Sequence, residues 1–254
     1  MSTPVSELPE AVAARLLRAA RHDSPPVDLA RVSRLWPKFA VAQEDLDREG
    51  YLLTFGTQGA EIVLKQDDPL ARKRFTWAHE LGHWVLARIR DGLTLFGPEP
   101  VTRVSLGEIR DSWDERWCDR FAANLLMPSS DLINFLAARA MHADVLINGN
   151  SQFAVSREAY LSRVVELTAI SVIEVSQTGG RDRVHRRYVS RLVGNEKIES
   201  AVSSLIGAGT AVRPRFASIV VNGLTVWRSR PVKGRSSWWL VLAPEGDELP
   251  RRAS

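Results

Sequence analysis

The 254-residue sequence predicts an α+β protein, with a first part in which helices pack on a small sheet and a smaller, more β-rich part after it. Amphipathic patterns, with apolar residues three and four apart, dominate up to about residue 170 and indicate helices. Beyond that point, short β-type runs and a strong hairpin signal dominate. We therefore expect a first domain over residues 1–175 and a second, basic region over residues 176–254.

The N-terminal third predicts two helices and a hairpin. Apolar residues recur at helical spacing over residues 7–21, and the run Ser24-Pro25-Pro26 ends that helix. Asp28 can cap a second, short helix that runs to Leu35. A β-hairpin is expected where two β-type runs, residues 51–55 and 62–64, flank Gly56-Thr57-Gln58-Gly59.

A long helix follows and carries the most informative pattern of the chain. Asp68 and Pro69 read as its N-cap and first residue, and we expect it to continue to Arg90. The sequence His79-Glu80-Leu81-Gly82-His83, an HExxH motif, falls beside the apolar stripe of this helix. Glycine inside a helix costs about 1 kcal/mol relative to alanine, so Gly82 indicates close packing at this position.

Three further helices are expected in the second third of the chain. The first covers residues 114–127 and is stopped by Pro128. The next covers residues 129–140, and Ser129 or Ser130 can cap it. The last covers residues 157–168, and Ser156 can cap it. Residues 142–150 between them are expected to form a loop.

The C-terminal region is expected to contain a second hairpin. Asn222-Gly223 joins two β-type runs, residues 218–221 and 224–227, and this dipeptide is a strong turn signal. Residues 238–242 read as a last strand, and the polar tail after residue 245 is expected to fray.

The charge of the chain is uneven. Residues 1–150 hold 18 Lys+Arg and 21 Asp+Glu, net −3, whereas residues 151–254 hold 16 and 9, net +7. A basic region of this kind could contact DNA or an acidic protein. No nucleic-acid-binding motif accompanies the charge, so a solvated arginine-rich surface is the simpler interpretation.

Composition also bears on location. The N-terminus has no basic segment followed by an apolar one, so no secretory signal is expected. No apolar run reaches the length of a membrane span. The single cysteine, Cys118, excludes an intramolecular disulfide and fits a reducing compartment. We expect a cytoplasmic protein that does not enter a membrane.

The HExxH motif predicts a zinc site. Residues four apart on a helix share one face, so the His79 and His83 rings can reach the same zinc ion. Glu80, beside the first histidine, is placed to take a proton from the attacking water. This arrangement is typical of hydrolytic metalloproteases.

A third protein ligand is needed, and the helix over residues 114–127 is expected to supply it. Glu115 is the best candidate, and Asp119, four residues on, can accept the other N–H of a ligating histidine. Both acids could instead be exposed partners of neighbouring arginines. Other possible ligands are Glu108, Asp111, Asp114 and, as a thiolate, Cys118.

Two blocks of sequence form a longer pattern around these candidate residues. The first is Arg74-Phe75-Thr76-x-Ala78 followed by the HExxH residues, and the second is Glu115-x-x-Cys118-Asp119-x-Phe121-Ala122-Ala123-x-Leu125-Leu126-Met127-Pro128. Together the two blocks resemble the ImmA/IrrE family of metallo-endopeptidases. A third block, Phe153-x-Val155-Ser156-x-x-Ala159-x-x-x-Arg163, and the preceding helix–helix–hairpin region extend the resemblance over roughly residues 10–170.

The resemblance implies a zincin-like fold, with His79, His83 and Glu115 as zinc ligands and Glu80 as catalytic base. It also implies a protein substrate, because members of this family cleave helix-turn-helix repressors of mobile elements or stress genes, and some pair with such a regulator in toxin–antitoxin-like operons. A protein donor for the oxyanion is left open among His142, Tyr51, Tyr160 and Tyr188. The last 80 or so residues match nothing in the family pattern.

Two other functions are compatible with the sequence. The protein could be a non-proteolytic regulator that binds a repressor, or binds DNA through its basic C-terminal part. It could also be a protease toxin that acts on a housekeeping protein. The intact Glu80 argues against a pure binder, which has no need of a catalytic base.

Overall fold

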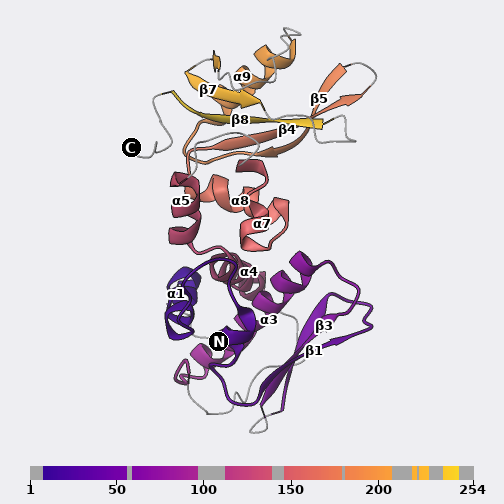
Figure 1. Ribbon diagram of the computed structural model, residues 1–254, viewed down its shortest axis with the longest axis vertical. Helices are drawn as coiled ribbons and strands as arrows, with labels where there is room; N and C mark the ends of the chain where they lie inside the picture. The colour runs from indigo at the N-terminus through magenta and orange to yellow at the C-terminus, as the bar shows by residue number, and fades with distance from the viewer. Residues whose placement is uncertain are drawn as a thin grey trace. The chain divides into compact units, whose positions relative to one another are not determined.

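The computed structural model describes residues 8–55, 59–96, 112–138, 146–178, 181–207, 219–221, 223–228 and 237–245. The chain divides into two compact units, residues 1–128 with 152–156, and residues 129–151 with 157–254. The expected boundary after residue 175 stays a prediction. The mixture of helices with two small sheets, richer in strands toward the C-terminus, confirms the predicted α+β class (Figure 1).

The first unit contains a three-stranded sheet in the order β1-β3-β2, formed by β1 (Phe39–Glu44), β2 (Gly50–Thr54) and β3 (Ala60–Lys65). Strands β2 and β3 are antiparallel, which confirms the predicted hairpin, although residues 56–58 of its turn lie outside the described residues. Strand β1 is parallel to β3 and was not predicted. Its residues are half-buried or exposed without regular alternation, so the sequence shows no period of two there.

Among the described residues of the first unit, the longer helical segments are α1 (Pro9–Ala19), α2 (Leu29–Ser33), α3 (Leu70–Arg90) and α4 (Ser112–Leu126). Helix α3 packs on β2 and β3 and against α4, and α4 also packs against α1 (Figure 1). All four helices are confirmed, with ends that differ by a few residues from the predicted ones. Helix α3, which carries the HExxH residues, therefore contacts both the sheet and α4.

The two predicted helix caps have different outcomes. Asp28 accepts a hydrogen bond from the backbone N–H of Arg31 at 2.9 Å, as predicted for the cap of α2. The prediction for Asp68 was wrong, because α3 begins at Leu70 and Pro69 occupies the N-cap position without a side-chain cap. Pro69 itself has an extended backbone, with φ −55° and ψ 144°, so the first helical residue is Leu70 and the N-cap position moves from Asp68 to Pro69.

The second unit contains a five-stranded sheet in the order β5-β4-β8-β7-β6, in which all neighbours are antiparallel. The β6–β7 pairing confirms the predicted hairpin at Gly223, although Asn222 of its turn lies outside the described residues. The predicted last strand is confirmed and lies within β8. The elements of this sheet are β4 (Ser171–Thr178), β5 (Arg181–Tyr188), β6 (Ile219–Val221), β7 (Leu224–Arg228) and β8 (Ser237–Pro244).

Helices α5 (Ser129–Ala137) and α8 (Arg157–Leu167) confirm the predicted helices of this region, within the part of the chain that is described. Helix α7 (Asn150–Phe153) begins inside the segment that was expected to be a loop. Helix α9 (Asn195–Gly207) was not predicted, although its buried Ile198, Val202 and Leu205 recur at helical spacing. These side chains pack in one cluster with residues of β4, β7 and β8.

Within the described ranges, no helix has both the length and the apolar character that crossing a membrane requires.

Candidate metal centre

Helix α3 places the two histidines of the motif side by side. His79 and His83 are one helical turn apart, and their Nε2 atoms lie 3.0 Å from each other. Both side chains are mostly buried, with 13% and 10% of their surface exposed. The two Nε2 atoms therefore face the same small volume beside α4.

Helix α4 brings Glu115 to this volume. Its Oε2 atom lies 3.1 Å from His79 Nε2, and its Oε1 atom lies 3.5 Å from His83 Nε2. The donor atoms of all three side chains lie within 4.8 Å of one another. The structure thus brings together the three residues predicted as ligands, in an arrangement that could hold a metal ion.

The donor set fits zinc in chemistry and in spacing. Two nitrogen atoms and one carboxylate oxygen form a set found in catalytic zinc sites, which leave a fourth position for water or substrate. In a tetrahedral site with ligand bonds of about 2.0–2.1 Å, ligand atoms are about 3.3 Å apart. The three closest separations, 3.0, 3.1 and 3.5 Å, lie near this value.

The second ring nitrogen of each histidine is also held by α4. Nδ1 of His79 lies 2.9 Å from Oδ1 of Asp119, in the position predicted for that acid. Nδ1 of His83 lies 3.4 Å from Sγ of Cys118, a contact the sequence did not predict. Cys118 therefore faces the nitrogen that points away from Glu115 and His79, which is the wrong side of the ring for a ligand of the same metal ion.

The acids around His79 change its affinity for a proton. Burial lowers the pKa of the His79 imidazole, but the hydrogen bond that the ring donates to Asp119 and the charges of Glu80, Asp119 and Glu115 outweigh burial and leave this pKa above its ordinary value of 6.5. A ring surrounded by three acids attracts positive charge, whether that charge is a proton or a metal ion.

Glu80, the predicted catalytic base, is buried, with 3% of its surface exposed. It lies on α3 next to His79 and is close enough to act on the charge of that ring. Burial of a carboxylate in a protein interior is uncommon without a structural or chemical role.

The other predicted candidates are placed as follows. Asp114 forms a two-point ion pair with Arg90, with one contact at 2.6 Å, so its carboxylate is engaged at the end of α3. Tyr51 lies on β2 in the first unit, whereas Tyr160 and Tyr188 belong to the second unit. Glu108, Asp111 and His142 lie outside the described residues.

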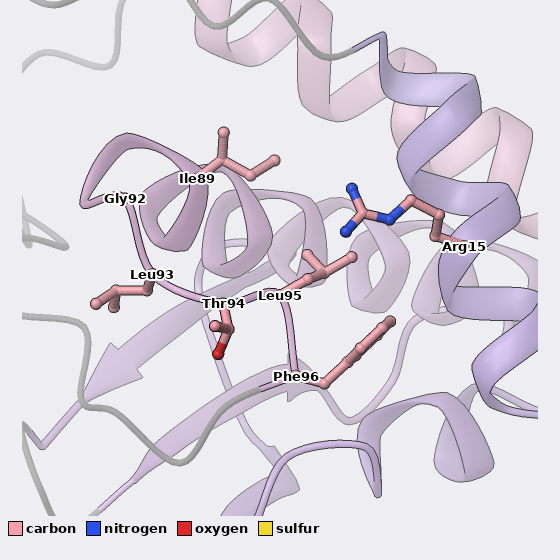
Figure 2. A pocket seen from close by; sticks show the side chains of 7 residues that line it. All are labelled: Arg15, Ile89, Gly92, Leu93, Thr94, Leu95 and Phe96. Atoms are coloured by element: carbon pink, nitrogen blue, oxygen red, sulfur yellow. The ribbon is translucent and has the colours of Figure 1, made fainter.

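A separate cavity of about 600 Å³ lies in the first unit beyond the C-terminal end of α3. Figure 2 shows the Arg15 side chain extending from α1 toward the loop that contains Leu95. Arg88, which is buried, holds this loop by donating two hydrogen bonds to the carbonyl of Thr94, at 3.0 and 2.6 Å. None of the residues predicted for the metal site lines this cavity.

Comparison with known proteins agrees with this geometry. The family model for peptidase M78, described as the IrrE N-terminal-like domain, matches residues 38–164, which is half of the chain and contains every residue of the metal group. A solved structure described as a Mycobacterium tuberculosis transcriptional regulator has 14% sequence identity and a TM-score of 0.51, over 93% of this chain and 75% of that one, and so shares the fold. Among curated proteins, none matches this sequence. The match of the family model over half of the chain, a segment that includes α3 and α4, shows that the chain belongs to the ImmA/IrrE family of M78 peptidases.

Proposed function

We propose that the protein is a zinc-dependent endopeptidase, with His79, His83 and Glu115 as the zinc ligands and Glu80 as the general base. The observation that carries this proposal is the convergence of two histidine nitrogens and one carboxylate within 4.8 Å, from two helices that pack against each other. Family membership supports the peptidase part of the proposal independently of the geometry.

When bound, zinc would supply Lewis-acid chemistry, that is, polarisation of the peptide carbonyl and activation of water. Glu80 would hold the attacking water, accept its proton and deliver that proton to the nitrogen of the leaving peptide. Asp119 would orient the His79 ring through Nδ1, so that the Nε2 lone pair faces Glu115 and His83. The oxyanion donor stays open, and Tyr51 is the candidate that lies in the same unit as the metal group.

The sheet suggests how a peptide would be held. Strand β2 lies at one end of the order β1-β3-β2, so one of its backbone edges faces away from β3. Gly50 of β2 approaches α3 so closely that a Cβ atom there would meet Thr76 Cγ2 at 2.7 Å. An extended substrate could pair with this edge of β2, through main-chain hydrogen bonds that do not depend on side chains.

We further propose that the substrate is a helix-turn-helix repressor. This follows from the activity of the family that the sequence resembles, and the description of the similar solved structure as a transcriptional regulator is compatible with a role in gene regulation. A reducing cytoplasm, where such a repressor acts, suits a chain that has one cysteine, which is buried, and therefore no intramolecular disulfide.

DNA binding by the basic C-terminal part has less support. Strand β5 carries four arginines, but Arg186 pairs with Glu158 of α8 and Arg187 pairs with Glu199 of α9. These two charges therefore join the strand to its neighbouring helices within the second unit, rather than being available to phosphates.

The proposal is tested with three variants, His79→Ala, Glu80→Gln and Glu10→Gln, and two assays. Glu80→Gln should retain one zinc per chain and lose cleavage of a proteome-derived peptide library, scored by mass spectrometry as new termini. His79→Ala should lose both. Glu10, an acid on α1 in the same unit, provides the matched control, and its variant should keep both. Wild-type protein that binds no zinc, or Glu80→Gln that cleaves normally, would overturn the proposal.

Co-expression with a candidate helix-turn-helix regulator tests the substrate. Wild-type protein should convert the regulator to two fragments, and Glu80→Gln should leave it intact. Growth arrest with no change in any such regulator would point instead to a toxin that acts on a housekeeping protein. Full biological activity of Glu80→Gln would point to a regulator that works by binding alone.

A further inference from the structure

Two consecutive residues of α4 hold the two histidines of α3. Cys118 Sγ lies 3.4 Å from His83 Nδ1, and Asp119 Oδ1 lies 2.9 Å from His79 Nδ1. The matching Nε2 atoms, on the other side of each ring, face Glu115. The helix thus supplies one ligand and two supporting contacts within five residues.

The position of Cys118 is fixed by packing. Its side chain is fully buried, and its helix approaches α3 at Gly82. A Cβ atom built at Gly82 would lie 3.3 Å from both Cα and Cβ of Cys118. The absence of a side chain at Gly82 therefore allows the sulfur to reach the imidazole of His83, one residue further along α3.

We infer that Cys118 is a positioning residue that holds the His83 ring through Nδ1, with its sulfur as the acceptor of the Nδ1–H hydrogen bond. This contact fixes the ring in the tautomer that leaves the Nε2 lone pair directed at Glu115 and His79. The inference rests on the proposed metal site and gives Cys118 a role other than ligand or simple packing.

The two residues that contact the histidine Nδ1 atoms, Asp119 and Cys118, differ in charge. Asp119 is a carboxylate with 57% of its side chain exposed, whereas Cys118 offers a weak, neutral acceptor in a fully buried place. A buried carboxylate at position 118 would add a negative charge that water could not solvate. A thiol orients the ring of His83 without that cost.

The substitutions Cys118→Ala and Cys118→Ser separate this role from packing. Serine restores an acceptor of similar size, whereas alanine removes it. Zinc affinity, measured by competition with a chromophoric chelator, should fall about 10–100-fold in Cys118→Ala, the range for lost partners of metal-binding histidines. Cys118→Ser should recover most of that loss. Ala122→Gly, a fully buried site one turn further on α4, removes a methyl group but no hydrogen-bonding atom and should leave zinc affinity unchanged.

Urea unfolding of the metal-free variants reports the change in packing separately from the change in metal affinity.

Cobalt substitution of the wild-type protein provides a measurement that needs no variant, because a cysteine ligand gives a sulfur-to-cobalt charge-transfer band and a positioning cysteine does not. We expect no such band.

Three results would overturn the inference: equal zinc affinity in wild type and Cys118→Ala, equal loss in Cys118→Ser and Cys118→Ala, or a sulfur-to-cobalt band. A wild-type protein that binds neither zinc nor cobalt is a different outcome, since it would remove the proposed function itself.

Discussion

Nδ1 of His79 lies 2.9 Å from Oδ1 of Asp119, and this contact joins α3 to α4 on the side of the ring opposite to Nε2, which faces Glu115. The carboxylate is more than half exposed, whereas the imidazole is mostly buried. Asp119 therefore keeps contact with water while it fixes the orientation of a ring that water barely reaches.

Replacing Asp119 should weaken metal binding without removing a ligand. We expect Asp119→Ala to lower zinc affinity about 10–100-fold, as other partners of metal-binding histidines do. Asp119→Asn retains a neutral acceptor oxygen and should fall between Asp119→Ala and wild type. Isothermal titration with zinc measures the affinity, and Asp47→Asn, at a side chain with 91% exposure in the same unit, is the control. No change in Asp119→Ala would contradict the role assigned to this contact.

The raised pKa of His79 predicts how the metal-free protein responds to pH. Because the folded state binds this proton more tightly than the unfolded state, the proton contributes stability fully below about pH 6.5, the unfolded pKa. This contribution is lost as pH rises from there through the higher folded pKa. The unfolding free energy in urea with a chelator should therefore fall over that window in wild type, and fall less in His79→Gln.

Zinc should reverse the sign of this dependence. The metal binds the deprotonated imidazole, so protons compete with it, and the zinc-bound protein should become more stable as pH rises through the same window. Parallel pH profiles with and without zinc would show that the metal does not bind at His79.

Local patterns predicted most of the residues that meet in the candidate metal site. The i, i+4 spacing within α3 and within α4 was enough to place His79, His83, Glu115 and Asp119 on helix faces. It could not show that the two faces meet, nor which ring nitrogen each neighbour contacts, because those depend on the separation of two helices. The Cys118–His83 contact was missed for this reason. The sequence shows that Cys118 lies beside Asp119, but it does not show which atom the sulfur contacts.

The unpredicted elements have physical reasons too. Strand β1 pairs in parallel with β3. The first paired residues, Phe39 of β1 and Ala60 of β3, are 21 residues apart in the sequence. No local turn signal marks a pairing of that kind. Helix α9 lies in a region where the surrounding runs are β-type, and its own helical spacing is visible only once Ile198 and Leu205 are known to face one cluster.

The ion pair between Arg90 and Asp114 should stabilise the first unit. It links the last residue of α3 to the first turn of α4, with 32% and 15% of the two side chains exposed, and Arg90 also lies over the ring of Trp113. Asp114→Ala should lower the unfolding free energy by about 1–2 kcal/mol, more than a surface pair contributes, because the geometry is two-point and partly buried. Urea unfolding checks this value. A double-mutant cycle with Arg90→Met should show coupling, and additive effects would contradict it.

The separation of α3 and α4 should control metal binding, and Gly82→Ala tests this directly. The added Cβ would lie 3.1 Å from Phe121 Cδ1 and 3.3 Å from the Cα of Cys118, and the backbone of Cys118 can yield only if α4 moves. The gain in helix propensity, about 1 kcal/mol, should be exceeded by crowding, which costs about 1–3 kcal/mol, so the metal-free variant should be slightly less stable than wild type.

The same displacement of α4 should weaken zinc binding, because Glu115 and Asp119 both lie on that helix while the histidines lie on α3. Chelator competition should show an affinity loss larger than that of Gly194→Ala, where a Cβ atom would meet nothing within 4 Å. If Gly82→Ala binds zinc as tightly as wild type, the close approach at Gly82 is not what sets the distance between the ligands on the two helices.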